Sequence, residues 1–240
     1  MADGIYAAAA GMAAQQTRMD AIANDLANAD TPGYKSQRVA FHDLVYSREA
    51  NVAVGAGAAA IDAGRSSAQG TVTDASDPLS LAIDGPGFFQ IRRPDGTVGL
   101  TRDGSFKLDA SGSLVTSQGD RLVPPVTIPK GAQPSDVSVS ESGTVTVAGR
   151  IVGQIALANV PSPGGLLAVG DSTFVATTAS GAAAPLRGGR IQQSALEESN
   201  VDTASAMTDL LDAQQTYSLS SRAIQTEDQM LQIANQITST

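Results

Sequence analysis

The 240-residue chain has no cysteine, no tryptophan and a single histidine, His42. Without cysteine there are no disulfide bonds, no thiolate metal sites and no cysteine nucleophile. A metal site would then need His42 together with carboxylates at ligand spacing. No such spacing is present, so we interpret this histidine as structural or solvated. Aromatic residues make up only 4% of the chain, so any hydrophobic core must be largely aliphatic.

Charge and hydropathy exclude further classes of protein. The 15 basic and 24 acidic side chains give a formal net charge of −9, which makes the chain a poor ligand for nucleic acid or anionic membranes. No apolar run approaches the ~18 residues that a membrane-spanning helix needs, so we expect no membrane insertion. The segment Met1-Ala2-Asp3 lacks the positive charge of a secretory signal peptide. Export by a route that needs no cleaved peptide is still open.

The two ends of the chain share one hydrophobic period. Residues 3–28 and about 201–237 contain no proline, and in each segment large apolar residues recur every seven positions. Such a narrow stripe is typical of a helix that packs against another helix. We therefore predict a helical seam used in assembly, formed by Ile5, Met12, Met19, Ile22, Leu26, Leu210, Tyr217, Ile224 and Leu231.

These two helices are expected to pair and to gain stability from neighbouring copies of the chain. A single pair of such helices buries little area and is marginal alone. The small and uncharged polar residues on the remaining faces would let further helices approach closely. Ser199 or Asn200 is the predicted cap of the C-terminal helix. At this stage the alternative, in which both helices pack on one globular core, is also open.

Between about residues 71 and 190 the pattern is that of β-structure. Asp-Gly or Ser-Gly, followed by a polar and an apolar residue, begins at 95, 103, 111 and 142, which is typical of tight turns between short strands. No helical pattern separates the strands, so a parallel sheet with crossover helices is not expected. The predicted fold class is α+β, with long N- and C-terminal helices paired as a coiled-coil-like domain and a central all-β domain.

We expect four segments along the chain. Residues 1–34 form the N-terminal helix and its turn, and together with 197–240 they make up a core domain. Residues 35–70, rich in alanine, glycine and valine, are predicted to be an extended connector. The central β domain covers residues 71–190, and the C-terminal helical segment covers 191–240.

The sequence contains no motif that indicates an enzyme. Gly85-Pro86-Gly87 lacks the third glycine and the following helix of a dinucleotide-binding loop, and the Asp-Gly units lack the ligand spacing of a calcium loop. We therefore predict that the chain is not an enzyme and has no catalytic residues, no cofactor and no metal ion. Acidic residues that only the fold brings together would leave no motif, so a secreted enzyme is one alternative. A surface protein or adhesin is another.

Four segments, in order along the chain, carry a family resemblance. They are a helix end and turn at 24–35, a Gly-Pro-Gly-Phe-Phe segment at 85–89, a Thr-Arg-Asp-Gly-Ser-Phe segment at 101–106 and a Leu-Glu-Glu-Ser-Asn-Val segment at 196–201. These segments resemble motifs of the flagellar basal-body rod and hook protein family, although Asp25 stands where that family usually has Asn. The first and last motifs rest on Asn24, Leu26, Ala27, Asn28, Thr31, Gly33, Tyr34, Lys35, Leu196, Glu197, Ser199, Asn200 and Val201.

The resemblance implies a structural subunit of the bacterial flagellar rod. Residues 37–46 and Ile128-Pro129 are most similar to distal rod members of the family. The segment 47–70 is shorter than the corresponding segment of those members. A proximal rod protein or a related hook-basal-body protein therefore remains as an alternative. Such a subunit assembles helically with itself into a hollow drive shaft that transmits torque to the hook, with the terminal helices in the inner tube.

The resemblance also implies partners and a location. The expected partners are further copies of the chain, other rod proteins, the hook protein, the ring proteins and the flagellar type III export apparatus. Export through that apparatus needs no cleaved signal peptide and places the subunit in the basal body, outside the cytoplasmic membrane. Head-to-tail contacts between copies would produce an open helical filament rather than a closed ring.

Overall fold

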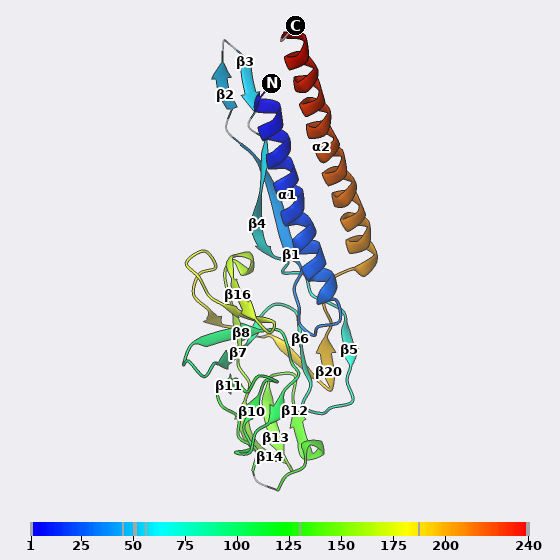
Figure 1. Ribbon diagram of the computed structural model, residues 1–240. Coiled ribbons are helices and arrows are strands. Elements are labelled where there is room, and N and C mark those ends of the chain that lie inside the picture. The colour runs from blue at the N-terminus through cyan, green and yellow to red at the C-terminus, as the bar shows by residue number, and fades with distance from the viewer. Residues whose placement is uncertain are drawn as a thin grey trace. The chain divides into compact units, whose positions relative to one another are not determined.

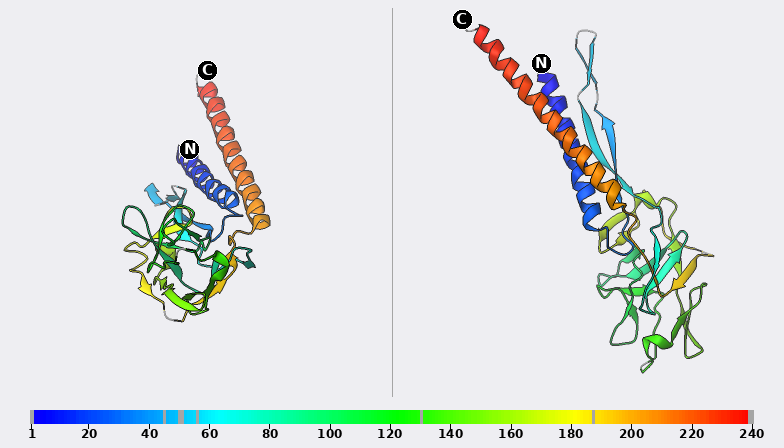
Figure 2. Two further views of the ribbon diagram at one scale, coloured as in Figure 1. Left: turned by 90° about the horizontal axis from the view of Figure 1, so that it is seen from below. Right: turned by 90° about the vertical axis from the view of Figure 1, so that its right-hand side faces the viewer.

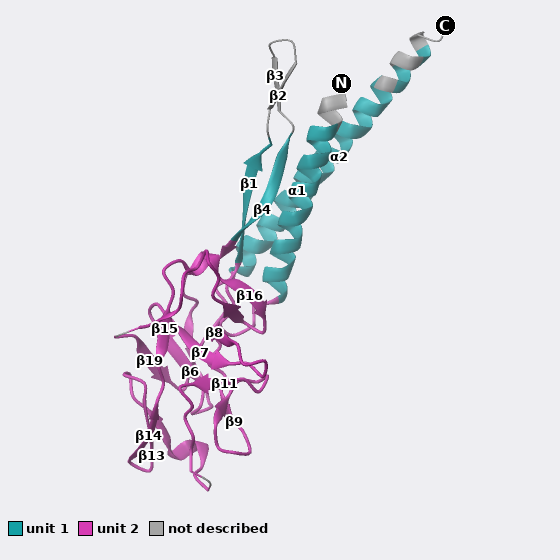
Figure 3. Cartoon of the chain, turned by 90° about the vertical axis from the view of Figure 1, so that its left-hand side faces the viewer, with its two compact units in different colours: residues 1–27, 37–63, 202–240 teal, residues 28–36, 64–201 magenta. Residues whose placement is uncertain are grey.

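The computed structural model describes residues 2–44, 46–49, 52–55, 57–129, 131–186 and 188–238. The chain forms two compact units, and each unit is built from segments that are distant in the sequence (Figure 3). Unit 1 consists of residues 1–27, 37–63 and 202–240, and unit 2 consists of residues 28–36 and 64–201. The chain therefore passes between the two units four times.

Unit 1 contains two long helices and two pairs of strands. Helix α1 (Ala2–Ala27) and helix α2 (Thr203–Thr238) contact each other and lie side by side (Figures 1 and 2). At ~1.5 Å per residue, the 26 residues of α1 span roughly 39 Å and the 36 residues of α2 roughly 54 Å. Strand β1 pairs with β4 and β2 pairs with β3; their bounds are Gln37–Asp43 (β1), Tyr46–Glu49 (β2), Val52–Gly55 (β3) and Ala58–Arg65 (β4).

Asp202 caps the N-terminus of α2. Its Oδ2 accepts a hydrogen bond from the hydroxyl of Ser205 at 2.8 Å, and its Oδ1 accepts one from the backbone N–H of Ala204 at 3.0 Å. These bonds stabilise the ionised carboxylate and therefore hold the pKa of Asp202 below its usual value. The bond from the Ser205 hydroxyl makes the largest contribution. The cap is therefore neither Ser199 nor Asn200, and the amide of Asn200 has partners within unit 2 instead.

The two helices do not form the coiled-coil-like pair that the sequence predicts. The α+β class agrees with the structure, but this part of the predicted fold class is wrong. In a heptad seam the large apolar side chains would be buried, whereas the most buried apolar side chains of the described helices are Ala14, Ala21 and Ala213. Tyr217 of the predicted seam is 37% exposed. Alanine at these positions lets the two helix backbones approach closely. Helix α1 also packs against β1, so the apolar stripe of α1 faces a strand as well as a helix.

The segment predicted to be an extended connector contains strands β1 to β4. Gly57, just before β4, lies directly on α1, because a Cβ at this position would be 3.0 Å from the Cβ of Ala10. The run of alanine, glycine and valine gives no clear alternation of apolar and polar residues, which is why the sequence gives so weak a strand signal here. The division of the chain into the four segments remains a prediction.

Unit 2 is built from short antiparallel strands. The largest sheet has nine strands in the order β16-β17-β8-β7-β11-β10-β9, with β15 paired to β7 and β18 paired to β15. Smaller sheets have the orders β12-β13-β14, β19-β6 and β20-β5. The bounds are Val72–Asp74 (β5), Leu81–Asp84 (β6), Phe88–Arg92 (β7), Val98–Thr101 (β8), Lys107–Leu108 (β9), Leu114–Val115 (β10), Arg121–Val123 (β11), Val137–Val139 (β12), Thr144–Val147 (β13), Arg150–Gln154 (β14), Leu157–Asn159 (β15), Leu167–Gly170 (β16), Thr173–Val175 (β17), Ala184–Pro185 (β18), Arg190–Gln193 (β19) and Ala195–Glu197 (β20).

Two hydrophobic clusters, one for each face of strand β7, form the core of unit 2. Successive side chains of a strand point to opposite faces, and Phe88 and Phe89 accordingly belong to different clusters. The ring of Phe89 lies edge-on to Phe106 with centroids 5.2 Å apart, and that of Phe88 lies edge-on to Phe174 at 6.1 Å. Apart from Phe89 and Phe106, the cluster around Phe89 is aliphatic. Both aromatic residues of the Gly-Pro-Gly-Phe-Phe segment thus serve the core.

Asp-Gly units of unit 2 form turns. Oδ1 of Asp95 accepts the backbone N–H of Thr97 at 2.9 Å, and Oδ1 of Asp103 accepts that of Ser105 at 2.9 Å. Such bonds close a turn by imitating a backbone contact. Within the described part of the chain, no group of three or more acidic or histidine side chains is placed to hold a metal ion. Among the same residues, neither helix combines the length and apolarity needed to span a membrane.

Candidate functional site

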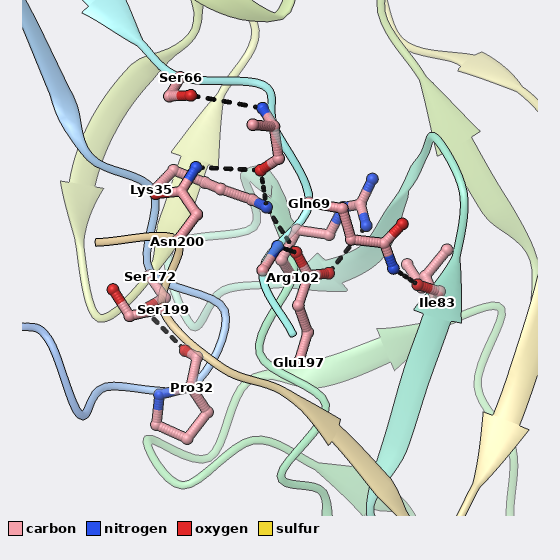
Figure 4. Close-up of polar contacts among 12 residues, drawn as sticks. Pro32, Lys35, Ser66, Gln69, Ile83, Arg102, Ser172, Glu197, Ser199 and Asn200 are labelled. Carbon is pink, nitrogen blue, oxygen red and sulfur yellow. Dashed lines mark hydrogen bonds and ion pairs between the residues drawn. The ribbon is translucent and has the colours of Figure 1, made fainter. Parts of the chain in front are cut away.

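The four segments that carry the family resemblance meet within unit 2. Lys35 comes from the first, Gly85 from the second, Arg102 from the third and Glu197 from the fourth. Figure 4 shows the side chains of Lys35, Arg102 and Glu197 pointing toward one another, although 162 positions separate Lys35 from Glu197. We call these three side chains the buried junction.

Glu197 is at the centre of the buried junction and is bonded through both carboxylate oxygens. Its Oε1 accepts hydrogen bonds from Nζ of Lys35 at 2.5 Å and from the backbone N–H of Gly70 at 3.0 Å. Its Oε2 accepts a hydrogen bond from Nη1 of Arg102 at 2.8 Å. The exposed fractions of the Lys35, Arg102 and Glu197 side chains are 4%, 5% and 0%. The carboxylate is thus shielded from bulk solvent and bonded to three protein donors.

The two cations of the junction also bind backbone carbonyls. Nζ of Lys35 donates to the carbonyl oxygen of Ala68 at 2.6 Å, and Nη2 of Arg102 donates to that of Gly85 at 2.9 Å. Because these carbonyls belong to other segments than the carboxylate, the junction ties together the turn after α1, the segment before β5, the loop after β6, the loop after β8 and strand β20.

The turn that places Lys35 packs closely on the loop after β8 and on strand β20. Gly33 has φ = +67°, and its backbone N–H donates to the carbonyl oxygen of Glu197 at 2.8 Å. A Cβ at Gly33 would collide with the backbone of Arg102 and Asp103. Only glycine meets both demands, because it alone adopts this backbone region freely and leaves room for the neighbouring chain.

Two polar side chains fasten the segments around the junction. Asn200 accepts the backbone N–H of Ser36 at 2.8 Å and donates to the carbonyl oxygen of Ala68 at 2.9 Å. Nη1 of Arg65 donates to the hydroxyl of Tyr34 at 2.9 Å, and its guanidinium carbon lies 5.4 Å from the centroid of that ring. Residues 34–36, 65–68 and 200 therefore form one network.

The electrostatics of the junction are dominated by burial. Two cations share one carboxylate, so the cluster carries a net charge of +1 on side chains that are at most 5% exposed. Burial lowers the pKa of Lys35 below the ordinary lysine value, the bond to Glu197 opposes this shift, and the charge of Arg102 adds to it. The arrangement binds segments together, and it has no nucleophile with an adjacent base.

We predict that Lys35 titrates below the ordinary lysine value of ~10.4. Since its pKa is lower in the folded than in the unfolded chain, the unfolded chain binds more protons between these two values. The contribution of Lys35 to the free energy of unfolding should therefore rise with pH across that window. Carbon-detected NMR of the lysine side chains measures the midpoint directly. A Lys35 midpoint at or above that of a lysine in a model peptide would contradict the prediction.

The predicted motif residues lie on both sides of the chain's passage between the units. Asn24, Leu26 and Ala27 are in the last turn of α1, whereas the residues from Asn28 to Lys35 and from Leu196 to Val201 belong to unit 2. Asp25, which stands where the family usually has Asn, is buried in unit 1. Its carboxylate accepts the backbone N–H of Gln37 at 3.0 and 3.2 Å.

The predicted seam residues are only partly covered by the rest of the chain. Ile5 and Leu231 lie outside the residues whose side chains the structure describes. Among the others, Tyr217 is exposed, and the half-buried ones are Met12, Met19, Ile22, Leu26, Leu210 and Ile224. An ion pair, with Nη2 of Arg18 2.7 Å from Oδ1 of Asp209, joins α1 to α2.

The sequence alone did not indicate Arg102, Arg65 or Gly70 as parts of this site. A signal for Arg102 was available, because Glu197 alternates with Leu196 on a strand and shares the inward side with Ala195. A carboxylate at an inward position requires a buried cation, and Arg102 lies within one of the four motifs. Gly70 takes part only through its backbone N–H, which no sequence pattern reveals.

Three family models match the chain and together cover most of it. Residues 5–35 match "Flagella basal body rod protein", residues 82–147 match "Flagellar hook protein FlgE/F/G D1 domain", and residues 192–237 match "Flagellar basal body rod FlgEFG protein C-terminal". The first and third matches contain Lys35 and Glu197, and the second contains Arg102. The buried junction is thus formed by one residue from each matched region.

Curated relatives are similar along the whole length. The flagellar basal-body rod protein FlgG of Caulobacter vibrioides is 40% identical, with 97% of this chain and 98% of the relative covered. FlgG of Borreliella burgdorferi is 38% identical with 99% of each covered, and FlgG of Bacillus subtilis is 34% identical with 97% of each covered. With this identity over nearly its entire length, the chain belongs to the flagellar basal-body rod protein family represented by FlgG.

Proposed function

We propose that the chain is the subunit of the distal part of the flagellar rod and builds that part by helical association with further copies of itself. The observation that carries this proposal is similarity to FlgG proteins over the full length, at 33–40% identity. A FlgF rod protein of Mesorhizobium japonicum is less similar, with 29% identity and 90% of the chain covered, so the similarity favours a FlgG-type over a FlgF-type subunit. A rod built in this way transmits torque from the motor to the hook.

The outer side of α2 supports the assembly role. At 100° per residue, five large apolar side chains lie between about 120° and 260° around the helix from the buried Ala213, on the side opposite to it. Each of them is more than half exposed in the single chain: Met207, Leu211, Leu219, Met230 and Ile233. A helix with one apolar side packed in its own unit and a second one exposed needs a further partner. We call these five residues the α2 outer face.

A second copy of the chain is the partner that fits the α2 outer face best. The polar residues on the same side of the helix are mostly uncharged Gln, Ser and Thr, and the charged ones are Asp212 and Arg222, so few charges would have to be paired in a contact between copies. The further partners that we propose are other rod proteins, the hook protein, the ring proteins and the flagellar export apparatus, because a rod subunit must be delivered and must be joined at both ends.

A deletion strain complemented with variants tests the proposal. Electron microscopy of basal bodies purified from the deletion strain should show no complete rod, and the unmodified chain should restore it. Leu211→Asp and Leu219→Asp should each fail to restore it, because each places an unpaired charge in a contact that excludes water. Thr216→Asp, at another exposed position of α2 outside the apolar face, should restore the rod.

The possible outcomes separate the function from the surface. Complete rods in the deletion strain would overturn the proposed function. Complete rods with both leucine variants would retain the function but reject the α2 outer face as the contact between copies. Circular dichroism of each purified variant checks that the chain is still folded.

A further inference from the structure

A small cavity in unit 2 lies beside the buried junction, and Lys35 and Arg102 form part of its lining. Its volume is about 60 Å³, and one ordered water needs roughly 10–15 Å³ by the same measure. Its charged lining consists of Lys35, Arg65 and Arg102, and none of its lining residues is acidic. Apolar walls are supplied by Phe88, Leu166 and Phe174. The cavity therefore combines three cations with a hydrophobic side.

The positive charge around the cavity exceeds what the junction neutralises. Among the residues that the structure describes, Glu197 is the one carboxylate that pairs with Lys35 and Arg102, so with Arg65 three cations face a single negative charge. Two of the three cations are almost completely buried, and a buried charge without a counter-charge is unfavourable. A negatively charged occupant would offset this excess.

Two hydrogen-bond donors on residues that line the cavity have no acceptor among the residues that the structure describes. The Arg102 side chain is only 5% exposed. Its Nε is fully buried and has no hydrogen-bond partner among the residues that the structure describes. Lys35 has three N–H donors, of which two are used by Glu197 and Ala68. One donor on each of two lining residues matches the two oxygens of a carboxylate.

We propose that this cavity is a binding site for a carboxylate carried on a short aliphatic stem, such as the side chain of glutamate or a small organic acid. The oxygens would accept from Nε of Arg102 and Nζ of Lys35, with Arg65 as the third cation, and the stem would lie against Phe88, Leu166 and Phe174. The apolar wall favours this ligand over inorganic anions, which expose charge on every side. This proposal concerns a site within one unit and does not depend on the proposed function.

Propionate is the probe, because it is the glutamate side chain without its backbone, and propionamide is its uncharged control. NMR of the arginine Nε–H groups in the full-length chain should show a saturable shift of the Arg102 signal with propionate and none with propionamide. Arg65→Gln should weaken binding about tenfold through loss of one charge-assisted contact. Arg93→Gln is the matched control, since Arg93 lies on unit 2 with a partly exposed side chain but outside the cavity.

Several results would overturn the proposal. These are the absence of a saturable shift, an equal response to propionamide, equal affinity in Arg65→Gln and Arg93→Gln, or displacement by chloride at the concentration of the probe. A second arm distinguishes the source of the carboxylate. If propionate but not propionamide slows self-association in light scattering, the natural occupant is an acidic side chain of another copy. If propionate binds without this effect, the occupant is a free acid.

Discussion

Replacing Glu197 with glutamine is expected to lower the free energy of unfolding by about 3–5 kcal/mol. The substitution keeps the shape of the side chain but removes the only negative charge of the buried junction, so Lys35 and Arg102 face each other without a counter-charge. The remaining amide also turns an N–H₂ group toward one of the two cations. Urea unfolding of the full-length chain, followed by circular dichroism, measures the change.

Glu198→Gln is the matched control for this experiment. Glu198 is the next residue in the chain, carries the same charge and is exposed. An exposed position of this kind should change the free energy of unfolding by no more than ~0.5 kcal/mol. If Glu197→Gln and Glu198→Gln have equal effects, the junction does not contribute to stability as we describe.

A second substitution tests whether the charges act as one cluster. Adding Lys35→Met to Glu197→Gln returns the net charge of the junction from +2 to +1, the value in the unmodified chain. The double variant should therefore be less destabilised than the sum of the two single variants, with a coupling of roughly 0.5–3 kcal/mol. Additive effects would mean that Lys35 and Glu197 contribute separately.

How far the sequence predicted this fold depended on the kind of signal. Long proline-free segments and Asp-Gly turns reported α1, α2 and a central β-rich region, because period and turn chemistry are local properties. The heptad repeat was misleading, because the most buried apolar helix residues are alanines such as Ala14 and Ala213, whose small size carries no periodic signal. A seven-residue spacing of large side chains indicates an apolar stripe on a helix, but it does not indicate which element packs against that stripe.

The candidate site was predicted in part. The resemblance to a family indicated Lys35 and Glu197 as motif residues. Nothing in the sequence predicted that Nζ of Lys35 lies 2.5 Å from Oε1 of Glu197. The junction depends on backbone groups of Gly70, Ala68 and Gly85, and any residue has such groups. Contacts between segments more than 100 positions apart arise from the tertiary fold, so one sequence shows the participants but not their meeting point.

Replacing Gly33 with alanine is expected to lower the free energy of unfolding by about 2–5 kcal/mol, the sum of ~1–2 for the left-handed backbone and ~1–3 for overpacking. The new Cβ would meet the backbone of Arg102 and Asp103, which no side-chain rotation can relieve. Moving the turn away would also break the bond from the Gly33 N–H to the carbonyl oxygen of Glu197, 2.8 Å long.

Gly96→Ala separates the two contributions to this loss. Gly96 also has a positive φ, +84°, but a Cβ there meets nothing within 4 Å. This control should therefore show only the backbone strain of about 1–2 kcal/mol. The difference between the two variants then reports how rigidly the turn is held against the strands beneath it. Equal losses would mean that the turn gives way easily, and the four motifs would then not form one rigid structure around Glu197.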